Sequence, residues 1–320
     1  MWPALGAVYV IWGSTYLAIR VMVETVPPAL GAGVRFVLAG AAMLAVLAAR
    51  RGATGVALPR AELLGCALVG TLLAAGGNGL VTIAEQDVPS GLAALLIASV
   101  PLWIVLYRSL GHDRVPRGTL AGVALGFAGV AVLLAPGGRP GHVPLGMALL
   151  IVLAAAFWGL GSFLAQRIRM PSDPLVSTGW QMLFGGTVMT MVGVGAGEAV
   201  SVDVGAFSAD SVIAFAYLVL IGSIVAFSCY AWLLGNAPIS QVSTYAYVNP
   251  VIAVVLGAVV LDEEVGTATV LGTGLVVASV AAIVRLEAGA PVRRAAPHGR
   301  PEGELHETTA TDTVSVASRN

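Results

Sequence analysis

Residues 12–20 read WGSTYLAIR, and residues 158–167 read WGLGSFLAQR. Both stretches carry Trp-Gly, a hydroxyl side chain, an aromatic residue, Leu-Ala and an Arg in the same order, about 147 residues apart. The second stretch has one extra residue, Leu160, and each stretch accompanies a long apolar run. The echo indicates either a biased composition or a duplicated unit, and these two interpretations lead to different functions.

The composition places the chain in a lipid bilayer. Of its 320 residues, 58% are hydrophobic and 10% are charged, and the mean hydropathy is +0.91. Water-soluble domains carry about a quarter charged residues, and their surface helices keep a polar stripe. The runs of this chain are apolar all round for about 20 residues, which is the length that spans the hydrocarbon core. Because no basic run interleaved with aromatic residues occurs, no nucleic acid partner is expected.

Ten apolar runs of membrane-spanning length follow one another along the chain, separated by segments rich in Pro, Gly and charge. We therefore predict an all-α polytopic membrane protein with ten transmembrane helices at about 3–22, 30–49, 62–83, 90–110, 117–135, 144–165, 174–195, 211–235, 239–261 and 266–286. Residues 287–320 are polar and lack periodicity, which predicts a disordered tail.

The arginines predict how the helices are oriented. The chain has no Lys, and with the N-terminus inside, thirteen of its 16 basic residues fall in cytoplasmic loops or in the tail. Acidic stretches, such as residues 198–210 and 262–264, fall on the opposite side. The positive-inside rule therefore predicts that both termini are cytoplasmic.

Further matches indicate that the echo is a repeat. Pro101 follows Pro89 after twelve residues, and Pro250 follows Pro238 after twelve residues, each pair in the same kind of run. Chance similarity in an apolar sequence would not keep Trp, both prolines and the loops in register. Because each half holds five spans, an odd number, the second half must lie upside down relative to the first. We predict two inverted five-helix repeats at residues 3–135 and 144–286.

Several segments resemble a known family. WGSTYLAIR, GNGLVTIAEQDVPSGLAALL, and VSTYAYVNPVIAVVLG followed by DEEV are similar to the two EamA repeats of the drug/metabolite transporter superfamily, in particular to its YedA-like bacterial inner-membrane exporters. The resemblance covers about residues 3–286 and implies a multi-pass inner-membrane transporter with a central cavity lined mainly by helices 1, 3, 4, 6, 8 and 9. Residues 111–114, GHDR, depart from the usual Gly-Glu-Arg or Gly-Glu-Lys turn, which leaves the role of this loop open.

Polar and aromatic residues inside the spans are the candidates for contact with a substrate, because polar groups that face lipid are costly. Their helical spacing groups them on single faces. An alternative interpretation remains, since Ser, Thr, Asn and Gln often bond between helices, and Trp and Tyr often form interface belts. The candidates are Trp12, Thr15, Tyr16, Asn78, Thr82, Trp158, Ser162, Trp232, Tyr245, Tyr247 and Asn249.

Two prolines and three charged residues are further candidates. Pro101 and Pro250 each remove a backbone hydrogen bond within a span, and their matched placement favours a hinge. Arg35, near the outer end of the second span, could bind a substrate carboxylate, extend outward or form an external ion pair. Glu24 and Glu85 are its candidate partners and, in the absence of a histidine within a span, the candidates for proton coupling.

These features predict a carrier that exports small neutral or zwitterionic metabolites, amino acids or lipophilic compounds by alternating access. Phosphorylated substrates would need several cations in the cavity, and the spans offer at most one Arg there. The expected partners are a small-molecule substrate and the bilayer, with a homodimer as a further expectation.

Two other classes of protein fit the sequence less well. A membrane receptor or scaffold could use the tail to bind a partner, but the chain offers no large soluble domain. An intramembrane enzyme is disfavoured because no HExxH, no nucleotide-binding GxxxxGK[ST] and no histidine within a span occur. We therefore expect no enzyme activity, no cofactor and no metal site.

Overall fold

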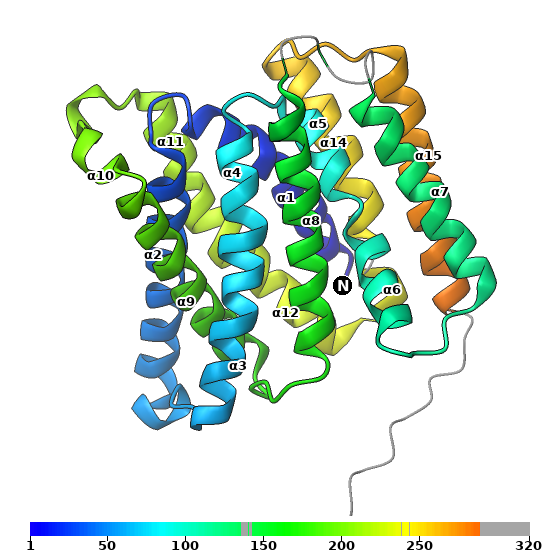
Figure 1. Ribbon diagram of the computed structural model, residues 1–320. Helices are drawn as coiled ribbons and strands as arrows, with labels where there is room; N and C mark the ends of the chain where they lie inside the picture. Colours follow the sequence, from blue (N-terminus) through cyan, green and yellow to red (C-terminus); the bar gives the residue numbers. More distant parts are fainter. Residues whose placement is uncertain (136–139, 141–142, 238, 243, 289–320) are drawn as a thin grey trace, which may run out of the picture. The chain divides into compact units, whose positions relative to one another are not determined.

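The computed structural model describes residues 1–135, 140, 143–237, 239–242 and 244–288, and these residues fall in one compact unit, Met1–Gly289 (Figure 1). The described residues form helices and loops and contain no strand, which confirms the predicted all-α class. The predicted disordered tail lies outside the described residues from position 289 onward.

The α-helices are α1 (Trp2–Met22), α2 (Pro28–Arg51), α3 (Arg60–Gly70), α4 (Leu80–Ala84), α5 (Ser90–Ile97), α6 (Val100–Leu110), α7 (Arg117–Leu134), α8 (Leu145–Ala165), α9 (Pro174–Gly195), α10 (Glu198–Ser201), α11 (Ala209–Tyr217), α12 (Ala226–Asn236), α13 (Ile239–Val242), α14 (Tyr245–Val260) and α15 (Thr267–Ala288). Short 3₁₀ turns, η1 (Ala53–Gly55) and η3 (Val204–Ala206), lie in loops. Two π-helical stretches, η2 (Thr71–Gly79) and η4 (Leu218–Val225), continue α3 and α11.

Eight helical stretches of the described residues are long and apolar enough to cross a membrane. They are α1, α2, Arg60–Ala84, Ser90–Leu110, α7, α8, Ala209–Leu233 and Thr267–Leu286. The ninth predicted span corresponds to α14, a shorter apolar helix. The seventh corresponds to α9, whose 22 residues include several polar side chains and which is not among the eight. Length and composition therefore confirm a multi-pass membrane protein.

The π-helical stretches occupy matching places in the two halves of the chain. Thr71 and Leu218, where they begin, are 147 residues apart, which is also the separation of Arg20 and Arg167 in the opening echo. Because a π turn closes its hydrogen bond one residue later than an α turn, it rotates the side chains that follow it around the helix axis. Both stretches therefore change which residues of their helix face inward.

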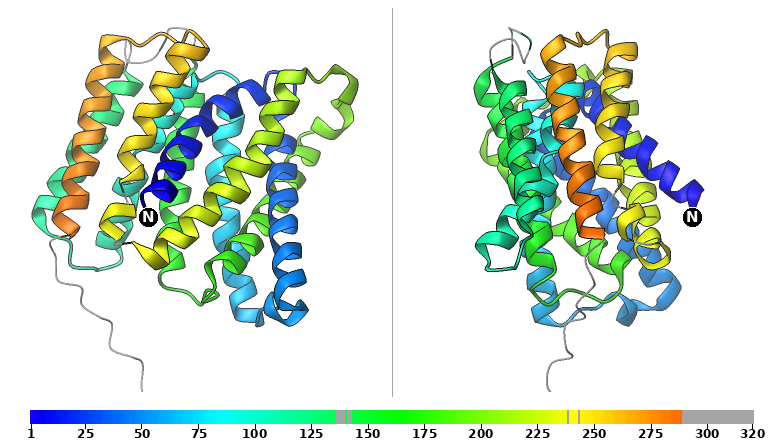
Figure 2. Two further views of the ribbon diagram at one scale, coloured as in Figure 1. Left: turned by 180° about the vertical axis from the view of Figure 1, so that it is seen from behind. Right: turned by 90° about the vertical axis from the view of Figure 1, so that its right-hand side faces the viewer.

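The bundle is built from helix pairs that lie side by side. α2 packs along α9, and α7 packs along α15 (Figure 2). Between α5, α6, α7, α8 and α15 lies the largest apolar core, which contains Leu96, Leu102, Leu133 and Ile151. Large apolar side chains such as Val259 remain exposed, as expected of a surface that faces lipid.

Small residues allow α3 and α9 to approach closely. A side chain at Gly185 would overlap the backbone carbonyl group of Gly70, and a side chain at Gly70 would overlap that of Gln181. In a membrane the apolar surface gives little drive for helices to associate, so close van der Waals packing through small residues supplies much of it.

The two ends of the bundle differ in charge, and they lie at the bottom and top of Figure 1. The arginine-rich end comprises the loops between α2 and α3, α6 and α7, and α8 and α9, with Arg51, Arg60, Arg114, Arg117, Arg167 and Arg169. The acidic end comprises α10 and the loops that follow α1, α4 and α14, with Glu24, Asp87, Glu198, Asp262, Glu263 and Glu264.

Asp173 fixes the start of α9 at the arginine-rich end. Its carboxylate accepts from the backbone N–H groups of Leu175 at 2.8 Å and Val176 at 3.2 Å and forms an ion pair with Arg51 of α2. Partial burial opposes ionisation, but the bonds from Arg51 and the two N–H groups outweigh it, so the pKa of Asp173 lies below its ordinary value. This contribution to stability is complete above the ordinary pKa and is lost as the pH falls through the lowered one.

We expect Gly185→Ala to lower the thermal stability of the protein in detergent, because the added methyl group must push α3 and α9 apart. Overpacking of this kind costs about 1–3 kcal/mol. The matched control is Gly195→Ala on the same helix, where a side chain would meet nothing within 4 Å. Unfolding midpoints measured by differential scanning fluorimetry check the expectation, and equal midpoints for both variants would contradict the close approach of α3 and α9.

Candidate substrate cavity

A cavity of about 360 Å³ lies among the helices. Its lining comes from α1, α2, η2, α4, α5, α6, α8, η4, α12, α14 and α15. The family resemblance implied a lining from the helices of the first, third, fourth, sixth, eighth and ninth predicted spans, and all of these contribute. Arg35 of α2 and two residues of α15 also line the cavity. A volume at the small end of the range for ligand pockets suits a small metabolite.

One side of the cavity is an aromatic wall, formed by Trp12, Phe227, Tyr230 and Tyr245. The ring centroid of Trp12 lies 5.2 Å from that of Phe227 and 5.1 Å from those of Tyr230 and Tyr245. The rings meet in edge-to-face or tilted arrangements, which are favourable for aromatic pairs. The wall joins α1, α12 and α14, so it depends on both halves of the chain.

Near the acidic end, the cavity reaches a buried positive charge. Arg35 is only 3% exposed, and among the described residues that line the cavity it is the only charged one. Its Nη2 donates to Oδ1 of Asn78 at 3.3 Å, and its guanidinium carbon lies 4.2 Å from the centroid of the Phe36 ring. Its Nε and Nη1 have no hydrogen-bond partner in the described part of the chain.

Glu85 is buried outside the cavity lining. Its side chain is 0% exposed, and neither carboxylate oxygen has a hydrogen-bond partner within the described ranges. Burial and the nearby Glu263 raise the pKa of Glu85 well above its ordinary value, and Arg20 and Arg35 oppose this rise only in part. No direct ion pair joins Glu85 to either arginine among the described residues. Nη1 of Arg20 instead donates to the backbone carbonyl groups of Glu85 and Gln86.

Glu263 ties the two halves of the chain together at the acidic end. Its Oε1 accepts from the N–H group of Ser90 at 2.7 Å, and its Oε2 accepts from that of Gly91 at 2.9 Å. The carboxylate thus caps α5 from the loop between α14 and α15. Among the described residues, none of the acidic-end loops lines the cavity, so the described part of the chain closes the cavity at this end.

A separate recess outside this contact is lined by acidic residues that include Glu24 and Asp87. Glu24 is exposed there and does not line the cavity. Among the described residues, no group of three or more His, Cys, Asp or Glu is arranged to hold a metal ion.

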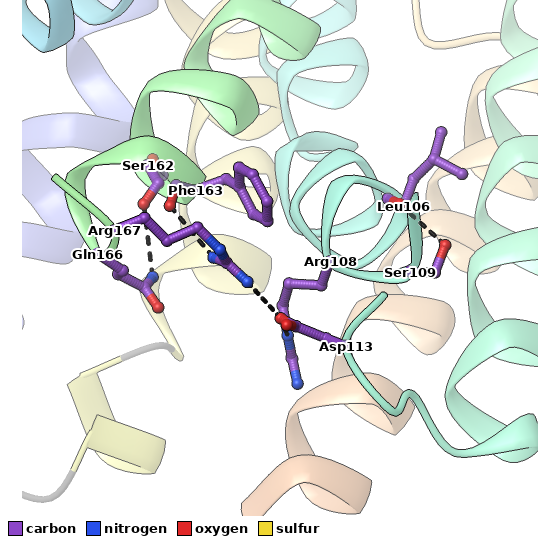
Figure 3. Close-up of polar contacts among 8 residues, drawn as sticks. All are labelled: Leu106, Arg108, Ser109, Asp113, Ser162, Phe163, Gln166 and Arg167. Carbon is purple, nitrogen blue, oxygen red and sulfur yellow. Dashed lines mark hydrogen bonds and ion pairs between the residues drawn. The ribbon is translucent and has the colours of Figure 1, made fainter. Parts of the chain in front are cut away.

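The cavity opens toward the arginine-rich end, where Ser162 and the exposed Gln166 line it. Figure 3 shows the ion pair of Asp113 with Arg167 beside these residues. Nε of Arg108 lies 3.6 Å from the same Asp113 oxygen. The contact holds the turn between α6 and α7 against the end of α8 and leaves Gln166 at the mouth of the cavity.

Both predicted hinge prolines line the cavity, but the helices around them differ. The fourth predicted span is interrupted between Ile97 and Val100, just before Pro101. Pro250 instead lies inside α14, which begins at Tyr245. Breaks of this kind free backbone carbonyl groups near the cavity. Whether the prolines act as hinges stays a prediction.

Eight of the eleven residues predicted to contact substrate line the cavity: Trp12, Thr15, Tyr16, Asn78, Trp158, Ser162, Tyr245 and Asn249. Three do not line it. Thr82 is buried and donates to the backbone carbonyl of Asn78 at 2.8 Å, Trp232 is 47% exposed, and Tyr247 packs against the largest apolar core. A role in substrate binding stays a prediction for the residues that line the cavity.

Some of the lining residues also bond to the backbone. Thr15 Oγ1 donates to the carbonyl group of Trp12 at 2.6 Å. The side-chain NH₂ group of Asn249 donates to the backbone carbonyl oxygens of Tyr9 and Tyr245, each at 3.3 Å. These side chains therefore form structural hydrogen bonds between or within helices, as the alternative interpretation expected, and they also line the cavity.

The sequence prediction missed two aromatic residues of the wall, Phe227 and Tyr230. They are spaced i, i+3 in the eighth predicted span, a signal that was available, but the prediction chose the face of Trp232 instead. All three residues lie in the same helix, α12, so the packing of that helix decides which of its faces meets the cavity.

Long apolar helices around a partly polar cavity that is closed at one end define a class, the polytopic membrane carriers. Residues 3–135 and 145–285 each match the model of the EamA-like transporter family. This chain therefore belongs to the EamA-like transporter family.

Individual relatives agree with this assignment. The chain is 39% identical over 282 residues to the uncharacterized inner membrane transporter YedA of Escherichia coli (strain K12). The aligned region covers 88% of this chain and 89% of YedA. It is 26% identical over 285 residues to a probable amino-acid metabolite efflux pump of the same strain, and this alignment covers 84% of this chain and 89% of the pump. A crystal structure of a protein 22% identical shares the fold, with a TM-score of 0.60 over 88% of this chain and 96% of that one.

We expect Glu263→Ala to open the acidic end of the cavity, because it removes both carboxylate bonds to the start of α5. Losing charge-assisted bonds costs about 1.5–3 kcal/mol, which shifts the ratio of closed to open forms about tenfold or more. The measurement is labelling of Val81→Cys, in the Cys66→Ala, Cys229→Ala background, by a membrane-impermeant thiol reagent in intact cells and in inverted vesicles.

The matched control is Glu264→Ala, which removes the neighbouring charge. Labelling should accelerate in the Glu263 variant alone, and from one side of the membrane alone. Equal acceleration in both variants would show that net charge, and not the cap on α5, keeps this end closed.

Proposed function

We propose that this chain is a bacterial inner-membrane exporter that moves small metabolites by alternating access. The cavity is the observation that carries the proposal: both halves of the chain line it, and it is closed at one end and open at the other. Its aromatic wall can pack an apolar group, while amides and hydroxyls such as Asn78 and Ser162 can bond neutral or zwitterionic ones. The relative named as an efflux pump supports export as the direction.

Local geometry supports two inverted five-helix repeats at residues 3–135 and 144–286. His112 and Asp262 both adopt a positive φ, 64° and 52°, and they are 150 residues apart. Such values are uncommon outside glycine, so the turns after α6 and α14 share an unusual shape. The matching π-helical stretches agree, and so does the packing of α1 on α14 and of α8 on α5 and α6.

The repeat relation supports a two-state mechanism. Asp113 and Glu263 occupy equivalent positions 150 residues apart, and Arg20 and Arg167 occupy equivalent positions of the opening echo. Asp113 binds Arg167 at the open end, whereas Glu263 caps α5 and Arg20 holds backbone carbonyl groups at the closed end. In the opposite state the two ends exchange these contacts, so that Glu263 pairs with Arg20 and Asp113 leaves Arg167. Rocking of the repeats then exposes the cavity to the other side.

The arginine-rich end faces the cytoplasm in this proposal, following the positive-inside rule. Both termini are then cytoplasmic, and the open end of the cavity loads substrate from inside the cell. Inner-membrane localisation agrees with the eight long apolar helices and with the name of the relative YedA. Proton coupling and a homodimer stay predictions.

We expect saturable counterflow into proteoliposomes for at least one compound in a labelled panel of neutral, aromatic and acidic amino acids and lipophilic metabolites, run with and without a pH gradient. Trp12→Leu should reduce the rate about tenfold or more, because it removes the centre of the aromatic wall, where each aromatic pair contributes about 0.5–1.5 kcal/mol.

The matched control is Trp232→Leu, since Trp232 is an exposed tryptophan of α12 outside the cavity. Wild-type rates are expected for this variant. Equal losses in both variants would remove the cavity from the transport path, and no counterflow of any compound would count against a carrier.

Reporter fusions test the proposed orientation. We expect a fluorescent protein that matures only in the cytoplasm to be bright when fused after Arg285 or at Met1, and dark when inserted beside Asp203. Periplasmic alkaline phosphatase should show the reverse pattern. A bright reporter beside Asp203 would invert the topology.

A further inference from the structure

Arg35 is buried without the partners that a buried charge requires. Removing a guanidinium from water is costly unless its N–H groups are bonded, and an isolated charge in the interior is costlier still. Asn78 accepts one bond from Nη2, and the Phe36 ring offers a weak cation–π contact. Nε and Nη1 bond to no group of the described chain. Intramembrane charges of this kind commonly mark a functional site.

The nearby carboxylate does not fill these positions. Glu85 and Arg35 attract each other, yet no ion pair joins them among the described residues, and both Glu85 oxygens are also left without a hydrogen bond there. Arg35 lines the cavity and Glu85 does not. A molecule in the cavity can therefore reach the guanidinium without meeting a fixed negative charge.

We propose that Arg35 is the anion subsite of the cavity and that the transported compounds carry a single carboxylate on an apolar or aromatic body. This inference rests on the proposed carrier function and names its substrate class. The free N–H groups of Arg35 bind the carboxylate through charge-assisted bonds, which are the strong ones at a site that excludes water. Binding supplies the partner that the buried guanidinium lacks.

The rest of the lining fits the body of such a compound. Phe227 belongs to the aromatic wall and also packs against the buried cluster that contains Phe36, the neighbour of Arg35. The carboxylate subsite and the apolar surface are therefore close together. A cavity of about 360 Å³ accommodates a body of about one or two rings.

The same arrangement disfavours two other classes of compound. Among the described residues of the lining, a cation would meet Arg35 as the only charged side chain and would find no carboxylate. A phosphate monoester carries close to two charges and is commonly bound by several cationic groups, while this lining offers one.

The test measures binding of isosteric pairs to the purified full-length protein in lipid nanodiscs at pH 7.5. The carboxylates are indole-3-acetate, 3-phenylpropionate and N-acetylphenylalanine, and each is paired with its neutral amide. Phenethylamine and phenyl phosphate are the cation and phosphate probes. Ligand-dependent shifts of the unfolding midpoint give the dissociation constants, because a ligand of the native state stabilises it by mass action.

In the wild type, each carboxylate is expected to bind about tenfold or more tightly than its amide, since the amide offers no charge to Arg35. The double variant Arg35→Gln, Glu85→Gln replaces both buried ionisable side chains together, so that removal of Arg35 does not leave Glu85 buried without a positive neighbour, and should lose this preference. Arg50→Gln removes an exposed charge from the same helix and should keep it.

Three results would overturn the inference: amides binding as tightly as carboxylates in the wild type, phenyl phosphate or phenethylamine binding more tightly than the carboxylates, or an unchanged preference in the double variant. The comparison of carboxylates with their amides in the wild type tests the inference even if the double variant does not fold. Counterflow of a neutral compound that depends on Trp12, together with no carboxylate preference, would leave the carrier function in place and remove the Arg35 subsite alone.

Discussion

In the hydrocarbon core of a membrane, every backbone N–H and carbonyl group must find its partner within the protein, and this constraint governs the rest of the structure. Regular helix satisfies it along most of the described chain. The departures are the break between α5 and α6, the stretches η2 and η4, and the start of α14. Each departure contributes a lining residue, namely Ala98, Asn78, Gly222 and Tyr245. Irregular backbone thus occurs where a cavity can compensate for it.

The repeat turns one arrangement of residues into two different ends. Arg20 and Arg167 come from the same position of the opening echo, but Arg20 bonds to backbone carbonyl groups and Arg167 bonds to Asp113. If the two copies lie in inverted orientation, as proposed, each end carries the residues for both sets of contacts, and a single conformation uses one set at each end. In the proposed mechanism the difference between the ends is a property of the conformation, and the similarity of their sequences allows each end to form either set of contacts.

Much of this could be predicted from the sequence, for identifiable reasons. Apolar runs of about 20 residues locate the helices, and the i, i+3, i+4 spacing of Trp12, Thr15 and Tyr16 places all three on the cavity. The spacing rule did not decide between the face of Trp232 and the face of Phe227 and Tyr230, because all three residues lie in α12 and tertiary packing alone decides which face meets the cavity. The polarity of α9 also follows from its sequence, but its close packing against α3 depends on a tertiary contact that no local pattern encodes.

The position of Arg35 illustrates what local pattern leaves open. From the sequence, an arginine seven residues into a helix of this kind can extend to the membrane surface, pair with an acid or face a cavity. Tertiary packing decides among these arrangements, because Phe36 and Asn78 hold the side chain inside at 3% exposure. Glu85 is buried nearby, and its carboxyl oxygens form no hydrogen bond within the described part of the chain. Packing therefore holds the guanidinium inside and leaves its Nε and Nη1 without a partner among the described residues, and a carboxylate bound at the proposed subsite completes this set of bonds.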